Sequence, residues 1–241
     1  MNNYLDNIKV VLCNTSHSGN IGSTARAMKT MGLSKLVLVN PKATIDEHAY
    51  ALASSASDVL DNAIICTSLD QALEDTVLGI GLSARMREFK HKIYTPREIS
   101  PLILEQAQLG HQIALVFGSE TNGLTIEEIE KCNHRLTIPA NPIYSSLNLS
   151  QAVQVICYEI YSQYNPGVTH LQSQSNPATF ADNQRILDNL SQIFKQIGYA
   201  PKGNHTLLMR RIQNILHKAQ LEKEETELIM GICKKILNHI K

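Results

Sequence analysis

The stretch "IPANPIYSSLNLSQAVQV", from Ile138 to Val155, joins a proline-rich turn to a long apolar helix pattern. Asn141-Pro142 predicts a turn, and Ser145 or Ser146 is a candidate cap for the helix that follows. A helix cap alone explains neither the length of the turn nor the tyrosine within it. We therefore interpret this stretch as a candidate binding loop as well as a helix start.

Upstream of this stretch, short β-branched runs alternate with helical patterns. The expected strands are residues 8–13, 35–40, 63–68, 77–83, 112–118 and 134–140. The expected helices are residues 21–32, 47–60, 69–76, 101–108, 125–132 and 147–164. This alternation predicts an α/β fold, with a parallel sheet covered by helices on both faces. Because such sheets bind ligands at the carboxyl ends of their strands, we expect a site in the loops after Cys13, Ser83, Gly118 and Ala140.

Downstream, the composition changes between residues 165 and 180, which we interpret as a linker. Residues 182–198, 205–220 and 223–240 then predict three amphipathic helices. The expected domains are therefore 1–164 and a helical C-terminal extension, 181–241. Residues 1–165 carry 12 basic and 16 acidic side chains, whereas residues 166–241 carry 10 and 6. The mildly basic extension permits contact with RNA but does not establish it.

The composition excludes several classes of protein. No apolar run approaches the roughly 18 residues of a membrane span, and "MNNYLDNIKV" lacks the pattern of a secretion signal. The five cysteines are scattered and form no C-x-x-C pair. We therefore expect reduced thiols in a cytoplasmic protein, and no metal site.

"TSHSGNIGSTARAMKTMG" follows the first expected strand. It is not G-x-G-x-x-G, and the second strand ends in Asn40-Pro41 without an acid for a ribose, so a Rossmann nucleotide enzyme is disfavoured. A helix N-terminus rich in Ser, Thr and Asn still suits a phosphate. From the residues alone, Asn20 is equally an ordinary cap and Arg26 a surface arginine.

"LVFGSETNGL" (115–124) runs from a strand into a glycine-rich turn. Gly118 would let the backbone approach a ligand closely, and Glu120 at the strand end could anchor a polar ligand. The same pattern also occurs in plain connecting loops.

In order and spacing, these three stretches resemble the three motifs of the SPOUT RNA methyltransferases, in the branch that methylates ribose 2′-hydroxyls. The likeness covers most of residues 8–160. Length and the C-terminal extension resemble bacterial members that methylate cytidine or uridine at position 32 of the tRNA anticodon loop. A short relative that acts on the wobble nucleotide lacks such an extension. Where this branch often has arginine after the motif glutamate, this chain has Thr121, which removes one cation for RNA.

The resemblance implies S-adenosylmethionine as cofactor, bound in a deep trefoil knot, and a homodimer whose active sites each include residues of both chains. Carried over by position, the cofactor-binding residues are Leu82, Ser83, Ala84, Gly118, Glu120, Ile138, Ser145, Ser146, Leu147 and Asn148. By the same resemblance, Asn148 would start the following helix and brace the loop.

The resemblance assigns catalysis to Arg26, with Asn20 beside it and Ser146 as a candidate partner of the hydroxyl. Because a guanidinium stays protonated in proteins, we expect Arg26 to bind phosphate and stabilise negative charge rather than act as a base. His17 is an alternative base, although phosphate or solvent contact is the simpler interpretation.

A basic loop with one aromatic residue follows the fourth strand, and it suits contact with RNA. Its cations include Arg85, Arg87 and Lys90, and a second basic group in the extension contains Arg210, Arg211 and Lys218. The alternative for the loop is a solvated surface, and the alternatives for the group in the extension are dimer packing or a solvated face. A non-catalytic RNA-binding protein, another tRNA site and ribosomal RNA remain open alternatives for the function.

Overall fold

The computed structural model describes residues 3–83, 93–164, 176–199 and 204–240. It divides into two compact units, residues 1–172 and 173–241. The predicted linker at 165–180 lies largely outside the described residues, since only its last five residues are described. No described helix is long and apolar enough to cross a membrane.

The first unit contains a seven-stranded sheet in which all pairs are parallel, with the order β3-β2-β1-β6-β4-β7-β5. The strands are β1 Ile8–Cys13, β2 Lys35–Val39, β3 Ile64–Cys66, β4 Thr76–Leu82, β5 Ile93–Tyr94, β6 Gln112–Phe117 and β7 His134–Leu136. All six expected strands are present. The two-residue edge strand β5 was not predicted, because it is too short to show a pattern.

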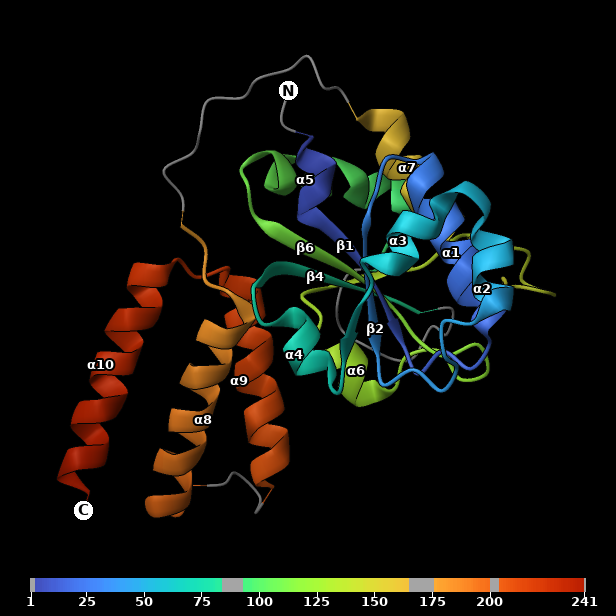
Figure 1. Cartoon of the computed structure of the whole chain (residues 1–241). Helices are drawn as coiled ribbons and strands as arrows, with labels where there is room; N and C mark the ends of the chain where they lie inside the picture. The colour runs from blue at the N-terminus through green and yellow to red at the C-terminus, as the bar shows by residue number, and fades with distance from the viewer. Residues whose placement is uncertain (1–2, 84–92, 165–175, 200–203, 241) are drawn as a thin grey trace. The chain divides into compact units, whose positions relative to one another are not determined.

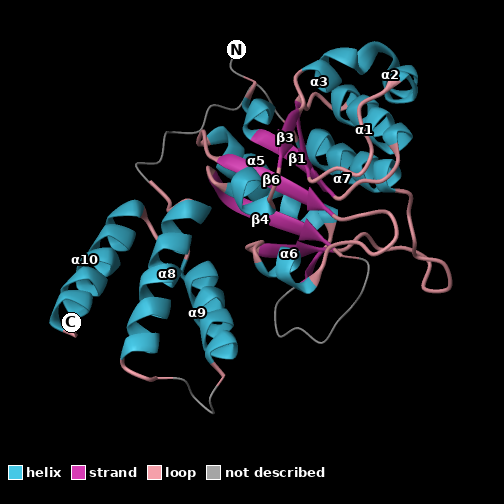
Figure 2. Cartoon of the chain, turned by 60° about the horizontal axis from the view of Figure 1, so that its bottom comes forward, coloured by secondary structure: helices cyan, strands magenta, loops and turns pink. Residues whose placement is uncertain are grey.

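Helices cover both faces of this sheet, as predicted (Figures 1 and 2). One layer contains α1 Ser18–Thr30, α2 Glu47–Ala53, α3 Ser57–Asp61, α5 Pro96–Gln108 and α7 Leu149–Gln163. The shorter α4 Leu69–Leu73 and α6 Ile126–Glu130 lie on the opposite side of the sheet in Figure 1. This arrangement follows the rule of right-handed crossovers, since connections that move toward β3 and those that move toward β5 must use opposite faces.

The main core lies between the sheet and the larger helical layer, and its residues are almost fully buried. Ile8, Val10 and Leu12 of β1 alternate toward this core and are inaccessible to solvent. Ile21, Ala25 and Met28 of α1 contribute the matching helical stripe. All five cysteines lie in described ranges and are buried free thiols, as expected, and burial raises the pKa of Cys132 to about 12.

Three helix boundaries differ from the expectation. The helix expected at 47–60 is broken at Ser54, whose φ of 54° is left-handed. α5 begins at Pro96 rather than Pro101, because Thr95 and Glu98 form a capping box and Pro96 occupies the first turn. α7 begins at Leu149 and its cap is Asn148, so Ser145 and Ser146 were the wrong choice of cap.

The second unit contains three helices, α8 Phe180–Gln196, α9 His205–Ala219 and α10 Lys223–His239. They agree with the three predicted amphipathic helices to within about two residues, the usual uncertainty of a helix boundary. Its core is small and is centred on Ile186, Leu187 and Leu216. Two backbone hydrogen bonds join the start of the unit to the turn before α10. The amide of Ala178 donates to the carbonyl of Leu221, and the amide of Lys223 donates to the carbonyl of Asn176.

Candidate active site

The loop after β6 is folded back on itself in a way that only glycine permits at its first position. A Cβ at Gly118 would lie 2.0 Å from the carbonyl carbon of Gly123 and 2.1 Å from the backbone nitrogen of Leu124. The amide of Gly123, whose φ is 66°, donates to the carbonyl of Ser119 at 2.9 Å. The loop is therefore a fixed turn whose backbone faces outward from the end of the sheet.

Glu120, at the tip of this turn, connects it to the other two motifs. Its carboxylate accepts hydrogen bonds from the amide of Ser16 at 3.0 Å, from the Ser16 hydroxyl at 2.9 Å and from Nδ2 of Asn20 at 2.9 Å. Oδ1 of Asn20 in turn accepts from Nδ2 of Asn148 at 3.0 Å. Asn148 also caps α7, because its Oδ1 accepts from the Ser150 amide at 2.9 Å. The three motifs thus form one hydrogen-bonded chain.

The environment of Glu120 favours the ionised form. Burial alone would raise the pKa of its carboxyl, but the hydrogen bonds from Asn20 and Ser16 outweigh burial and hold the pKa below its ordinary value. His17 Nδ1 lies 2.9 Å from the Ser16 hydroxyl and 3.7 Å from Glu120, while 71% of the His17 side chain is exposed. The network is therefore anionic at its centre and reaches solvent at His17.

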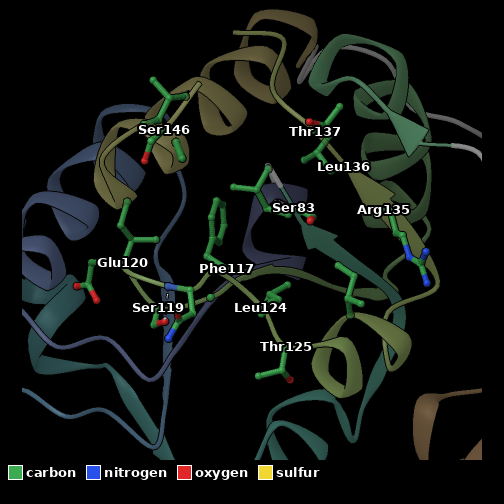
Figure 3. Close-up of a pocket in the computed structure, with 18 of the residues that line it drawn as sticks. Ser83, Phe117, Ser119, Glu120, Leu124, Thr125, Arg135, Leu136, Thr137 and Ser146 are labelled. Atoms are coloured by element: carbon green, nitrogen blue, oxygen red, sulfur yellow. Dashed lines mark hydrogen bonds between the residues drawn. The ribbon is translucent and has the colours of Figure 1, made fainter. Parts of the chain in front are cut away.

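A cavity of about 340 Å³ lies beside this network, between the ends of β4, β6 and β7. Phe117, Leu82, Ile93, Leu124 and Leu136 give it an apolar wall. Figure 3 shows Ser83, Leu136 and Thr137 across the cavity from Glu120 and Ser146. We refer to it as the inner cavity. Its mixture of an apolar wall with hydroxyls and exposed turn backbone suits a flat heteroaromatic group that carries a polar chain.

A second, more open hollow of about 1010 Å³ lies on the other side of Glu120, and we refer to it as the outer hollow. Polar and titratable residues of three loops contribute to its lining, including Ser16, His17, Asn20, Lys42, Asp46, His48, Tyr144, Asn148 and Ser150. The inner cavity and the outer hollow share four residues, Glu120, Ser146, Leu147 and Leu149. A group bound in one would therefore face a group bound in the other across this shared wall.

The structure brings together most of the cofactor-binding residues proposed from sequence. Leu82, Ser83, Gly118, Glu120, Ser145, Ser146 and Leu147 all line the inner cavity. Ile138 instead packs against the core, and Asn148 lines the outer hollow. Ala84 lies outside the described residues. Asn20 is not the cap of α1, since that position is His17; its side chain is used for the contacts with Glu120 and Asn148.

Arg26 is exposed on α1 and does not line either the inner cavity or the outer hollow. It lies six positions after Asn20, which places the two side chains about 120° apart around a helix. Within the described residues, Arg26 makes no hydrogen bond or ion pair. Its guanidinium is therefore directed away from the Glu120 network of its own chain.

Of the two basic groups proposed to bind RNA, the structure describes only the one in the C-terminal extension. Arg85, Arg87 and Lys90 lie outside the described residues. Arg210, Arg211 and Lys218 are exposed along α9.

Sequence reasoning missed several cavity residues. Phe117, Leu124, Leu136 and Thr137 line the inner cavity, and Lys42 and His48 line the outer hollow. The rule that ligands bind at the carboxyl ends of parallel strands could have indicated Phe117 and Leu136, since both end a strand. Nothing in the sequence alone indicated that Lys42 and His48 face the first motif.

Comparisons with known proteins agree on one family. The profile described as the SpoU rRNA Methylase family matches residues 7–158, and the profile of the tRNA methyltransferase TrmJ C-terminal domain matches residues 181–241. A tRNA (cytidine/uridine-2′-O-)-methyltransferase TrmJ of Pectobacterium atrosepticum is 42% identical over 241 residues, with 96% of this chain and 97% of that protein covered. The same-named protein of Klebsiella pneumoniae is 41% identical, with 96% and 97% covered.

Among solved structures, the crystal structure of TrmJ from Z. mobilis ZM4 superposes with a TM-score of 0.84 at 26% identity. The alignment covers 95% of this chain and 98% of that chain. The likeness therefore extends over both units of the molecule, each with the fold found there.

Proposed function

The chain belongs to the SpoU rRNA Methylase family, and from this premise we propose that it methylates a ribose 2′-hydroxyl of tRNA, with S-adenosylmethionine as the methyl donor. The observation that carries the proposal is the wall shared by the two hollows. A donor in the inner cavity and a ribose in the outer hollow would meet at Glu120, Ser146 and Leu147. Direct displacement of a methyl group requires donor and acceptor in contact, and the adjacent hollows support such an approach.

The residues of the inner cavity fit the proposed cofactor. Leu82, Leu124 and Leu136 offer an apolar surface for adenine, while Ser83 and Thr137 offer hydroxyls for its polar edges. The Gly118 turn presents backbone groups without a side chain in the way. When bound, S-adenosylmethionine supplies an electrophilic methyl group on a cationic sulfur.

The remaining chemistry falls to the side chains of the protein. A ribose hydroxyl is a weak nucleophile until its proton is being removed. Ser146 lines both hollows, which supports a hydrogen bond between its side chain and that hydroxyl. Arg26 would bind the adjacent phosphate and stabilise the negative charge that develops on the 2′-oxygen. A phosphate oxygen or water then accepts the proton, and Asn20 holds the first motif in place through Glu120.

We further propose that the protein acts as a homodimer. Arg26 is directed away from the network of its own chain, which supports a role in the active site of the partner chain. Tyr158 and Tyr161 lie on the same helical layer, on α7, and are 54% and 46% exposed. A second copy packed against α1 and α7 would bury these rings and bring Arg26 toward the outer hollow of its partner.

Other parts of the proposal concern architecture and substrate. The return of the chain from β7 to α7, which packs against α1 and α5, supports a trefoil knot in residues 1–164. The match of residues 181–241 to the TrmJ C-terminal profile supports tRNA rather than ribosomal RNA, and the names of the relatives support cytidine or uridine as the target nucleotide. The target position that we propose, 32 of the anticodon loop, follows from the resemblance of the sequence motifs and the C-terminal extension. Free thiols and a tRNA substrate support a cytoplasmic location.

The experiment that tests the function is methylation of defined tRNA transcripts by the purified protein, followed by mass-spectrometric mapping of ribose methylation. We expect the mark at cytidine or uridine 32. Methylation at another tRNA position, or only of ribosomal RNA, would contradict the target. If calorimetry detects no cofactor binding and no transcript is methylated, a non-catalytic RNA-binding role replaces the enzyme.

A further inference from the structure

We propose that Lys42 and His48 form a binding site for a backbone phosphate of the RNA strand, on the rim of the outer hollow. Both residues line this hollow beside the first motif, on elements that come after β2. The inference rests on the proposed function, because it requires an RNA ribose at the shared wall. It adds two contacts that come from outside the three motifs.

The first support is the close approach of α2 to α1, which places His48 next to the start of the first motif. A Cβ at Gly22 would lie 2.0 Å from the carbonyl oxygen of Ala49, and a Cβ at Gly19 would lie 2.7 Å from Cε1 of His48. Gly22 therefore allows an approach of the α2 backbone that no other residue would allow, and Gly19 leaves room for the imidazole of His48. They hold the imidazole of His48 directly against the N-terminal turn of α1.

The second support is the rigidity of the loop that carries Lys42. The amides of Lys42 and Ala43 donate to the same carbonyl oxygen, that of Thr15, at 2.8 and 3.1 Å. Nδ2 of Asn40 donates to Oδ1 of Asn14 at 3.0 Å, and both of these asparagines have left-handed backbone. The loop after β2 is thus hydrogen-bonded to the loop after β1. The acceptor, Thr15, immediately precedes Ser16, which contacts Glu120.

The third support is which charged side chains of the outer hollow are left available to a ligand. Its two carboxylates are occupied by donors of the protein: Asp46 accepts from the Ala49 amide at 3.0 Å, and Glu120 accepts from Ser16 and Asn20. Hydrogen bonds from Ala49 and Ser18 lower the pKa of Asp46. Lys42 and His48 are exposed and make no side-chain hydrogen bond or ion pair with any described residue. The carboxylates stay ionised, but their hydrogen bonds hold them to the protein, so Lys42 and His48 are the exposed donors left to contact an anionic group of a ligand.

A backbone phosphate is the anion that the proposed substrate brings to this position. The 3′ and 5′ oxygens of a nucleotide are each bonded to a phosphate, so a ribose at Ser146 necessarily carries phosphates into the outer hollow or to its rim. A lysine ammonium binds such a phosphate as a point charge, and the imidazole of His48 can donate a second hydrogen bond. Two contacts from one rigid face would fix the direction of the strand relative to the donor.

The test compares the full-length variants Lys42→Gln and His48→Gln with the control Lys35→Gln. Lys35 is the first residue of β2, the strand that leads to Lys42. The control substitution therefore removes the same charge at the opposite end of that strand. Affinity for a tRNA transcript is measured as a function of salt. We expect Lys42→Gln to weaken binding about threefold to tenfold at low salt and to reduce the salt slope by about 1. Lys42→Arg should restore both quantities, and Lys35→Gln should resemble the wild type.

Calorimetry of S-adenosylmethionine binding should give the same affinity for all variants, because neither residue lines the inner cavity. If Lys42→Gln and His48→Gln retain the wild-type affinity and salt slope while the wild type methylates tRNA, this inference is wrong and the proposed function stands. If the wild type binds tRNA with the expected dependence on Lys42 but transfers no methyl group, the proposed function fails and the phosphate site stands. If the wild type does not bind tRNA, both fail.

Discussion

The inner cavity and the outer hollow lie side by side but are built in opposite ways. The inner cavity has an apolar wall of residues at strand ends, closed by a turn in which Gly118 leaves no room for a side chain. The outer hollow is three times larger, polar and lined by loops and helix starts. Glu120 belongs to both and is hydrogen-bonded to residues of the first motif.

This difference indicates what each hollow can select. A rigid apolar cavity recognises one small molecule by shape, whereas an open polar hollow binds a polymer through charges and hydrogen bonds. Substitutions in the first should change cofactor affinity, and substitutions in the second should change RNA binding or transfer.

The largest expected effect is that of Arg26→Ala. Because Arg26 is exposed and lines neither hollow of its own chain, the variant should fold and bind cofactor normally. Methyl transfer under single-turnover conditions should fall by about a thousandfold, through loss of charge stabilisation at the 2′-oxygen. Lys29→Ala, on the same helix and bonded among the described residues to Asp58 and a backbone carbonyl, is the control and should retain transfer. Near-normal turnover of Arg26→Ala would remove this arginine from the catalytic step.

Gly118→Ala should have the next largest effect, and it should act on the inner cavity. The added Cβ would overlap the backbone of Gly123 and Leu124, so the turn must move. We expect destabilisation of about 3 kcal/mol and a loss of cofactor affinity of about a hundredfold. Chemical denaturation and calorimetry measure the two quantities. Gly231→Ala, where a Cβ meets no atom within 4 Å, should lower neither; equal behaviour of the two variants would refute the steric argument.

Glu120→Gln should reduce both cofactor affinity and methyl transfer, because Glu120 lines both the inner cavity and the outer hollow. The substitution leaves one acceptor oxygen where two are used, and we expect a loss of about 1–2 kcal/mol in the free energy of unfolding at pH 7. Since the pKa of Glu120 is lower in the folded state, its contribution is complete above the unfolded pKa and is lost as pH falls through the folded pKa. The difference between wild type and variant should therefore shrink below about pH 4. A difference that stays constant across this range would exclude an ionised Glu120 as its cause.

His17→Ala should have the smallest effect. The imidazole is largely exposed and its Nδ1 is within hydrogen-bond distance of the Ser16 hydroxyl, so we expect at most about a threefold loss of transfer, of the order of one exposed hydrogen bond. The pH–rate profile of the variant should match that of the wild type. Disappearance of an ionisation from the profile would instead identify His17 as the base.

The sequence indicated the sheet, its helices and three loops of the site, because strand-helix alternation and glycine-rich turns are local signals. It could not indicate β5, which has two residues, or the break at Ser54, where the helical pattern continues through a left-handed residue. It suggested Ser145 or Ser146 as the cap of α7, although the residue used is Asn148. The missing information is tertiary: which donors reach Glu120, and that Gly19 and Gly22 bring His48 to the first motif, depend on contacts between distant segments.

The chain of contacts from Ser16 through Glu120 and Asn20 to Asn148 has a consequence for how this protein can evolve. Each side chain in this chain of contacts is a hydrogen-bond partner of the next, so the effect of changing one depends on which residues occupy the other positions. Substitutions along this chain should be epistatic, and the residues can be exchanged only in compatible sets. The side chains of Ile143 and Tyr144, which are 92% and 77% exposed, lie outside this chain of contacts, so we expect substitutions there to be independent of it.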